Sequence, residues 1–335
     1  MKKGIAFAGN ILVDVVKTIE GYPRPGMLAG ITAVSQAVGG CVPNTAIDVA
    51  KMDPSVPVSA YGRVGDDAYG RYVTEQMAAH GIDVAHVLTT AGVPTSFSDV
   101  MSDISSGERT FFHARGANAL FSPDDIDPDT LDCRIFHIGY ILLLDIMDEP
   151  DDAYGTKLAR LLAKVQSRGI KTSIDAVSDS TGWFREKIVP ALRYCDYAVM
   201  NEIEGCGVSG LEPRHPDGSL HMENIRTTME LMLSLGVRER VILHSPEAGF
   251  MLTADGVFRH TASIHMDPSG IAGKVGAGDA FCAGCLYGLY TGMADEDLLA
   301  YAAAAAACNL TAADSVSGMR PAADVSAIAA CGRLV

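Results

Sequence analysis

The chain has 335 residues, of which 48% are hydrophobic, and its formal net charge is −15. This length and composition allow a large buried core, in one large α/β domain or in two smaller ones. The acidic surface repels nucleic acid and anionic membranes, so neither is expected as a partner.

Targeting signals and cysteines favour a cytoplasmic protein. The apolar stretch at the N-terminus is short and Asp14 interrupts it, so no signal peptide is expected. The longest apolar run, near residues 298–308, is mostly alanine and too short to cross a bilayer. The eight cysteines are expected to be reduced, largely buried thiols rather than a disulfide framework or a zinc site.

The N-terminal third of the chain combines strand and helix patterns with two irregular, polar stretches. The expected elements are a strand at 4–8, a helix at 44–52, a strand at 56–60, a helix at 67–80, and strands at 95–102 and 110–114. The turn sequence Ser105-Ser106-Gly107-Glu108 predicts a hairpin between the last two strands. The irregular stretches, about 11–36 and 93–116, resemble each other in character, so we expect them to pair into a small sheet.

From residue 135 onward strands and helices alternate. Strands are expected at 135–138, 172–175, 197–200, 241–243, 249–253 and 256–260, and helices at 152–168, 183–192, 222–235, 280–291 and 297–311. This alternation predicts an α/β fold, a doubly wound, mostly parallel sheet with helices on both faces, in a single domain over 1–335. Such a sheet binds ligands at the carboxyl ends of its strands. We expect the small sheet to project as a lid over that edge.

The tetrapeptide Gly276-Ala277-Gly278-Asp279 precedes a predicted helix. Glycine lets the backbone approach a ligand closely, and the N–H groups at a helix N-terminus favour an anion. Asp279 can cap the helix, or it can act as a general base that takes a proton from a substrate hydroxyl. On the tetrapeptide alone the cap is the simpler interpretation.

Two clusters in the N-terminal part allow both a functional and an ordinary structural interpretation. Gly39-Gly40 before Asn44 can hold a ligand against the backbone, or it can simply begin a helix. Asp14 can bind two hydroxyls of a polyol, or it can be an exposed loop carboxylate.

Two further clusters follow predicted strands. The loop 61–70 is interpreted as structural, with Asp66 or Asp67 capping the following helix. Asn201 and Glu204 suit Mg²⁺ held through water, or they belong to a loop with solvated charges.

The order of these clusters resembles the ribokinase-like (PfkB) family of sugar and nucleoside kinases. The resemblance extends from about residue 4 to 321, and its most specific pieces are RVGDDAYG at 63–70 and VGAGDAFCAG at 275–284. Family members fold as a doubly wound sheet with a β-lid and transfer the γ-phosphoryl group of ATP to a hydroxymethyl group. The resemblance therefore implies a kinase that requires ATP and Mg²⁺ and binds a small sugar.

The resemblance also implies roles for individual residues. Asp279 would be the general base, and the N–H groups of Gly276, Ala277 and Gly278 would form an anion hole for the moving phosphoryl group. Substrate hydroxyls are expected at Asp14, Gly39, Gly40 and Asn44. Nucleotide binding is expected at Asn201, His244, Gly249 and Asn309, and Mg²⁺ at Glu204 through water.

Two segments depart from the family pattern. Family members often have Asp-Thr where this chain has Gly273-Lys274, and that Asp helps bind K⁺ in cation-activated members. We therefore expect weak dependence on K⁺, with Lys274 supplying the missing charge. The nucleotide loop usually has the pattern Thr-x-Gly-x-x-Gly, whereas residues 244–249 read HSPEAG.

The phosphoryl acceptor stays open between ribose, fructose and a sugar acid, whose carboxylate Arg115 can meet unless it is a surface arginine. A nucleoside kinase and a non-catalytic sugar-binding relative are the alternatives. A dinucleotide oxidoreductase is disfavoured because Gly9-Asn10 lacks the G-x-G-x-x-G pattern. The aromatic residues Phe97, Phe111 and Phe112 favour a hydrophobic contact between two lids over stacking on a nucleobase. Lids of family members often pair into dimers, so the resemblance implies a homodimer.

Overall fold

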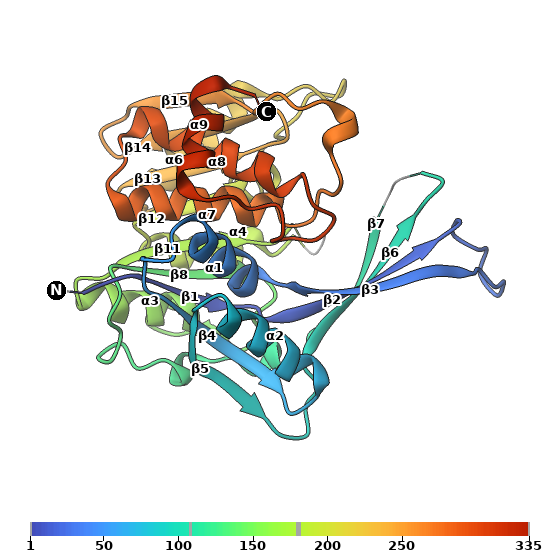
Figure 1. Ribbon diagram of the computed structural model, residues 1–335. Coiled ribbons are helices and arrows are strands. Elements are labelled where there is room, and N and C mark those ends of the chain that lie inside the picture. The colour runs from blue at the N-terminus through green and yellow to red at the C-terminus, as the bar shows by residue number, and fades with distance from the viewer. Residues whose placement is uncertain (1, 107–108, 179–181, 334–335) are drawn as a thin grey trace.

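The computed structural model describes residues 2–106, 109–178 and 182–333. Within these residues the chain forms a nine-stranded sheet between two helical layers, and a four-stranded sheet that extends to one side (Figure 1). The strands are β1 (Ile5–Gly9), β2 (Leu12–Ile19), β3 (Ile31–Gly39), β4 (Val58–Gly65), β5 (Asp83–Thr90), β6 (Ser96–Asp103), β7 (Arg109–Ala114), β8 (Ile135–Ile141), β9 (Pro150–Asp151), β10 (Gly155–Thr156), β11 (Lys171–Ala176), β12 (Tyr197–Asn201), β13 (Arg240–His244), β14 (Ala248–Thr253) and β15 (Phe258–Ala262).

The helices are α1 (Cys41–Met52), α2 (Ala68–Ala79), α3 (Lys157–Ser167), α4 (Phe184–Leu192), α5 (Glu202–Ser209), α6 (Met222–Ser234), α7 (Ala277–Thr291), α8 (Asp295–Asn309) and α9 (Ala322–Cys331). Short 3₁₀ turns lie at Gly116–Leu120, Pro123–Asp125 and Pro268–Gly270. None of these helices combines the length and the apolar character that crossing a membrane requires.

The large sheet has the strand order β15-β14-β13-β12-β11-β8-β1-β4-β5. Neighbours from β13 to β5 run parallel, whereas β14 and β15 add an antiparallel edge. The carboxyl ends of the seven parallel strands therefore meet at one edge, where an open α/β sheet binds its ligands. This architecture confirms the predicted fold class.

The two helical layers arise from the alternation of side chains along each buried strand. In β1, Ile5 and Phe7 pack into a core with α1, α7 and α8, while Ala6 and Ala8 face the core formed with α3, α4 and α6. Because both faces are covered, β1 is apolar along its whole length rather than alternating with polar residues.

The small sheet has the order β3-β2-β6-β7, in which β2 pairs parallel with β6 and the other neighbours are antiparallel. Two residues separate β1 from β2, the strand of the small sheet that comes first in the chain, so the small sheet stands at the carboxyl edge of the large one (Figure 1). Its strands are drawn from two separate segments of the chain. Of the predicted turn 105–108, Gly107 and Glu108 lie outside the described residues.

Several element boundaries differ from the sequence prediction. Helix α3 begins at Lys157 rather than at residue 152, because β9 and β10 form a short hairpin first and Thr156 caps the helix. Helix α1 begins earlier than predicted, at Cys41. The prediction omitted the edge strand β5 and the two short helices α5 and α9.

The cluster RVGDDAYG has a structural role at the junction of α2 and the small sheet. Asp67 caps α2 by accepting a hydrogen bond from the Gly70 N–H at 2.8 Å. The same carboxylate accepts bonds from the Thr95 N–H at 2.8 Å and the Thr95 hydroxyl at 2.6 Å. Partial burial raises the pKa of Asp67, but these hydrogen bonds outweigh it and the pKa is lowered. Asp66 has an exposed side chain beside Arg71.

Replacing Asp67 by Ala should lower the free energy of unfolding by about 1–2 kcal/mol at pH 7, because a cap and two further bonds are lost. Asp66→Ala is the matched control and should change it by less than about 0.5 kcal/mol. Urea unfolding measures both. The lowered pKa means that Asp67 stabilises the fold above the ordinary pKa of an aspartate, so the difference should shrink as the pH falls through about 4. Equal losses in the two variants would contradict this role.

Candidate active site

The N-terminus of α7 presents the predicted anion-binding sequence. Gly276 is the N-cap residue and adopts a left-handed conformation with φ 80°. A Cβ at this position would also lie 2.6 Å from the Ser315 Cβ, so both the backbone and the packing require glycine. Helix geometry leaves the N–H groups of Ala277, Gly278 and Asp279 without acceptors inside the helix. These N–H groups lie at the end of the helix that borders a cavity, which Gly276, Ala277 and Gly278 line.

Asp279 does not cap α7, so the capping interpretation is wrong. It occupies the third helical position, and its carboxylate turns away to accept hydrogen bonds from two distant elements. The Asn44 Nδ2 group of α1 donates to Asp279 Oδ2 at 2.8 Å. The Tyr140 hydroxyl of β8 lies 3.1 Å from Oδ1 and 3.0 Å from Oδ2. The carboxylate is thus held by side chains rather than by its own helix.

The environment of Asp279 suits a general base. Its side chain is 7% exposed, and burial together with the charge of Asp175 raises its pKa to about 6. Hydrogen bonds from Asn44 and Tyr140 and the proximity of His137 oppose this rise. A carboxylate with a pKa near 6 is ionised at neutral pH, yet it is more basic than an exposed aspartate.

A cavity of about 250 Å³ lies between the N-terminus of α7 and the carboxyl ends of β8, β11, β12 and β13. The carboxylates of Asp175, Glu204 and Asp279 line it, together with Lys274 and His244. Burial lowers the pKa of His244 to about 4, so its ring is neutral. The ring lies close to the backbone of α7, because a Cβ on Gly278 would be 3.2 Å from His244 Cε1.

Asn201 and Glu204 form a capping box at the start of α5, so the alternative of a loop with solvated charges is wrong. The Asn201 side chain accepts a bond from the Glu204 N–H at 2.8 Å, and Glu204 Oε2 accepts one from the Asn201 N–H at 3.0 Å. Glu204 Oε1 also accepts bonds from Asn201 Nδ2 and the Ser178 hydroxyl. Burial raises the pKa of Glu204 to about 8. Both residues line the cavity, so the capping box fixes them in place there.

Tyr140 was missed by the sequence analysis, which ended the strand at Ile138. It has a left-handed backbone, with φ 59°, which is unfavourable for a residue with a side chain. The Asp175 Oδ1 atom accepts a bond from the Tyr140 N–H at 2.6 Å and thereby anchors this conformation. Gly139 must lack a side chain, because a Cβ there would lie 2.6 Å from Asp175 Oδ1. The sequence signal that could have pointed to this part of the site is Asp175, an acid at the end of a predicted strand.

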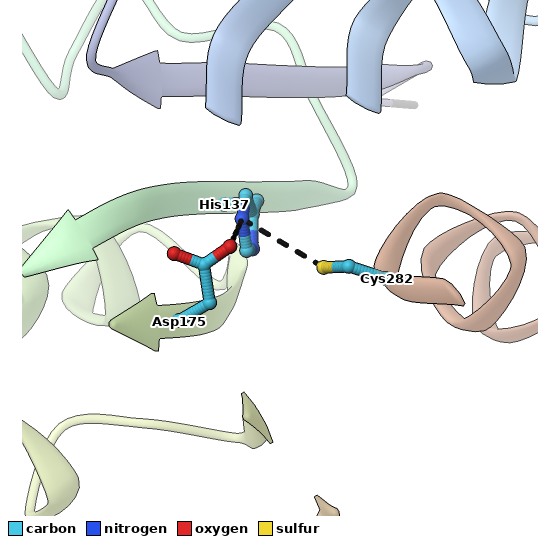
Figure 2. A group of neighbouring side chains, drawn as sticks. All are labelled: His137, Asp175 and Cys282. Atoms are coloured by element: carbon cyan, nitrogen blue, oxygen red, sulfur yellow. Dashed lines mark hydrogen bonds and ion pairs between the residues drawn. The ribbon is translucent and has the colours of Figure 1, made fainter. Parts of the chain in front are cut away.

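His137, Asp175 and Cys282 form a buried group of neighbouring side chains (Figure 2). The His137 Nε2 atom lies 3.4 Å from Asp175 Oδ2 and 3.9 Å from Cys282 Sγ. Cys282 and Cys285 form a Cys-x-x-Cys pair in α7, so the interpretation of the cysteines as scattered without such a pair is wrong. Both thiols are free and buried.

A second cavity, of about 420 Å³, lies between the small sheet and the body. Asp14 on β2 lines it and is 8% exposed; burial and the charge of Asp279 raise its pKa to about 7, while Arg109 opposes the rise. Gly39 leaves room for this carboxylate, because a Cβ there would lie 2.5 Å from Asp14 Oδ2. Asn44 joins the two sites, since its Oδ1 accepts a bond from the Ser315 hydroxyl at 2.7 Å, and Ser315 lines this cavity.

Three positions singled out in the sequence do not line either cavity. Gly249 is buried in β14 against the Phe281 ring. Asn309 is fully buried and donates to the Ser315 carbonyl at 2.5 Å. Arg115 donates to Asp145 at 2.7 Å and to the Leu142 carbonyl at 3.0 Å, so its guanidinium is already paired.

Comparison with known proteins gives the chain a family. The profile of the pfkB family carbohydrate kinases matches residues 2–322. A fructokinase of Klebsiella pneumoniae is 28% identical over 303 residues, which are 88% of this chain and 87% of the fructokinase.

Two solved structures share the fold. The structure of Arabidopsis thaliana ribokinase complexed with ribose and ATP superposes with a TM-score of 0.81 at 20% identity, covering 98% of this chain and 99% of the other. A candidate ribokinase II from E. coli in complex with ATP and Mg²⁺ gives a TM-score of 0.76 at 20% identity, covering 97% and 98%. The chain therefore belongs to the pfkB family of carbohydrate kinases and is a phosphotransferase with an alcohol group as acceptor.

Proposed function

We propose that the chain transfers the γ-phosphoryl group of ATP to a hydroxymethyl group of a small sugar, with Asp279 as general base. The observation that carries this proposal is the position of Asp279. Its buried carboxylate, with a pKa near 6, lies at the N-terminus of α7 and lines the cavity of about 250 Å³, where we place the phosphates. Asn44 links this carboxylate to the cavity of about 420 Å³, which we call the acceptor cavity. A base at such a junction can reach an acceptor hydroxyl beside an incoming phosphoryl group.

The proposed reaction uses the Asp279 carboxylate and the N–H groups at the N-terminus of α7. Asp279 takes the proton of the acceptor hydroxyl as its oxygen forms a bond to the γ-phosphorus, and the bond from that phosphorus to the ADP oxygen breaks. The N–H groups of Gly276, Ala277 and Gly278 stabilise the negative charge on the moving phosphoryl oxygens. Both contributions are positioning and electrostatic, as phosphoryl transfer requires.

The donor set of the cavity near α7 fits Mg²⁺. Three carboxylates, Asp175, Glu204 and Asp279, line it, and the pKa of Glu204 and of Asp279 is raised by burial and by neighbouring acids. Oxygen ligands and water suit this hard cation, and we propose that Glu204 holds it through water. When bound with ATP, it would neutralise charge on the phosphate oxygens.

The composition of the acceptor cavity favours a free sugar. Its wall on the small sheet presents Asp14, Thr18, Ser35 and Ser102, which are groups that bind hydroxyls. The nucleoside alternative is supported by Tyr72 and His80, because these two rings line the same cavity and a nucleobase stacks on aromatic faces.

We also propose that the small sheet acts as a lid and pairs with that of a second chain. Its strand register places Val34, Lys17, Asp99 and Phe112 on one face, Val34 and Lys17 in one row and Asp99 and Phe112 in the next. Val34 and Phe112 are 63% and 56% exposed, and they flank a Lys17–Asp99 ion pair. Phe111 lies on the other face, in line with Val16 and Val100 of the acceptor cavity, so only one of the two phenylalanines belongs to this outer face. Exposed apolar surface of this kind indicates a protein contact.

An ADP-release assay with Mg·ATP and a panel of free sugars, sugar acids and nucleosides tests the reaction. We expect acceptor-dependent ADP release that is strongest with a free sugar. Asp279→Asn should lower kcat by at least about 100-fold and leave the circular dichroism spectrum unchanged. Asp297→Asn, an exposed aspartate on α8, is the control and should retain full activity. A panel without any active acceptor would favour a non-catalytic sugar-binding protein.

Tyr140→Phe tests how the base is held. The Tyr140 hydrogen bond lowers the pKa of Asp279, so its loss should raise that pKa and move the acid limb of the kcat/KM profile up by about one pH unit. Activity should therefore fall most below pH 7. Tyr287→Phe also removes one buried tyrosine hydroxyl, which bonds Asp53 at 3.4 Å, and should leave the profile in place. An unmoved acid limb in Tyr140→Phe would remove Tyr140 from this role.

The proposed dimer predicts a specific effect of charge on the small sheet. Val34→Lys should convert a dimer into monomers in light scattering or sedimentation, because a buried lysine without a partner is costly. Val257→Lys introduces the same change at a 39% exposed position outside the small sheet and should leave the dimer intact. If the wild-type chain is monomeric at all accessible concentrations, the lid does not dimerise.

A further inference from the structure

The group formed by His137, Asp175 and Cys282 has the composition of a transition-metal site. Its members offer an imidazole nitrogen, a carboxylate oxygen and a sulfur, and these atoms all lie within 4.8 Å of one another. All three residues are buried, and they come from β8, β11 and α7 (Figure 2). Nitrogen and sulfur ligands of this kind suit Zn²⁺ rather than Mg²⁺ or Ca²⁺.

Two of the three distances between ligand atoms are close to those of a tetrahedral zinc site, and the third, between the Asp175 oxygen and the Cys282 sulfur, is within 4.8 Å. Zinc–nitrogen, zinc–oxygen and zinc–sulfur bonds of about 2.0–2.3 Å place pairs of ligand atoms about 3.3–3.6 Å apart. In the protein, His137 Nε2 lies 3.4 Å from Asp175 Oδ2 and 3.9 Å from Cys282 Sγ. Side-chain movements of a few tenths of an ångström therefore bring the nitrogen–oxygen and nitrogen–sulfur pairs to bonding geometry.

Two of the three ligands are already oriented by other groups. His137 Nδ1 lies 3.0 Å from the Ser173 hydroxyl, which leaves Nε2 directed at Asp175 and Cys282. Asp175 Oδ1 accepts the bond from the Tyr140 N–H, which leaves Oδ2 free to face the histidine. Such outer contacts fix the orientation of metal ligands and contribute strongly to metal affinity.

Charge also favours a divalent ion at this position. When Cys282 gives its proton to solvent, one thiolate and one carboxylate balance the two charges of Zn²⁺, and the imidazole stays neutral. The buried site then carries no net charge, which avoids the cost of an unpaired buried ion. Asp279 lines the adjoining cavity, and Lys274 is the cation that lines it among the described residues.

The site is open on one side. Asp175 and Cys282 line the 250 Å³ cavity, whereas His137 lies behind them. An ion can therefore enter from the cavity, and a water or a phosphate oxygen can take the fourth position. Three protein ligands with an open fourth position distinguish such a site from a closed, structural zinc site.

We propose that His137, Asp175 and Cys282 form a binding site for Zn²⁺ or another thiophilic divalent ion, and that occupancy of this site inhibits the enzyme. Inhibition rests on the proposed function: the ion would bind the Asp175 carboxylate that anchors Tyr140 and would lie next to the base, Asp279. Binding itself does not depend on that function. The proposal departs from the sequence-based expectation that the cysteines serve no metal site.

Cobalt(II) provides a direct probe of binding, because it replaces Zn²⁺ and its bond to a thiolate gives an intense near-ultraviolet charge-transfer band. We expect metal-free protein to develop this band, with visible bands of tetrahedral cobalt, at one ion per chain, and to lose both when Zn²⁺ is added. Cys282→Ser should abolish the charge-transfer band. Cys285→Ser, which alters a buried thiol one turn further along α7, and Cys331→Ser, which alters the exposed thiol, should retain it.

A second variant keeps the test decisive if Cys282→Ser fails to fold. Ser173→Ala leaves all three ligands but removes the group that orients His137, so the affinity for cobalt should fall by about 10-fold. Absence of the charge-transfer band in wild-type protein, or its persistence in Cys282→Ser, would overturn the proposed site. If the bands appear as expected but Zn²⁺ inhibits wild type and Cys282→Ser kinase activity equally, the site stands and its inhibitory role is excluded. These spectra need no kinase activity, so they remain valid if the proposed reaction is wrong.

Discussion

The carboxylate of Asp279 is the point at which distant parts of the chain are joined. Asp279 belongs to α7, and its carboxylate accepts hydrogen bonds from Asn44 on α1 and from Tyr140 at the end of β8. A buried carboxylate needs such donors, because it would otherwise be costly to remove from water. The same bonds lower a pKa that burial has raised, so the contacts that satisfy the group also set its basicity.

The segment that presents Tyr140 is held by carboxylates as well. Tyr140 and Leu142 both have positive φ values, and each N–H donates to a buried aspartate, Asp175 at 2.6 Å and Asp148 at 2.9 Å. Burial raises the pKa of Asp148 to about 7. Strained backbone persists only where surrounding contacts over-determine it, and such segments concentrate at functional sites. The strain therefore marks the end of β8 as part of the site.

Much of the fold could be predicted from side-chain periodicity. The apolar runs of the central strands and the helical spacing between them indicate a parallel sheet, because a strand covered on both faces has no polar side. The prediction failed where periodicity carries no signal. The start of α3 depends on a two-residue hairpin, and α5 is one of the shortest helices, stabilised by the Asn201–Glu204 capping box rather than by an amphipathic face.

Local spacing and local backbone freedom were enough to predict most of the strands and helices in their order, the glycines at the N-terminus of α7 and the family resemblance. Tertiary packing, in contrast, holds Asp279 through Asn44 and Tyr140 rather than at the cap of α7, and it brings His137, Asp175 and Cys282 together. Those contacts join residues up to 235 positions apart. Their geometry follows from the packing of α1 and α7 against the sheet, which no local pattern records.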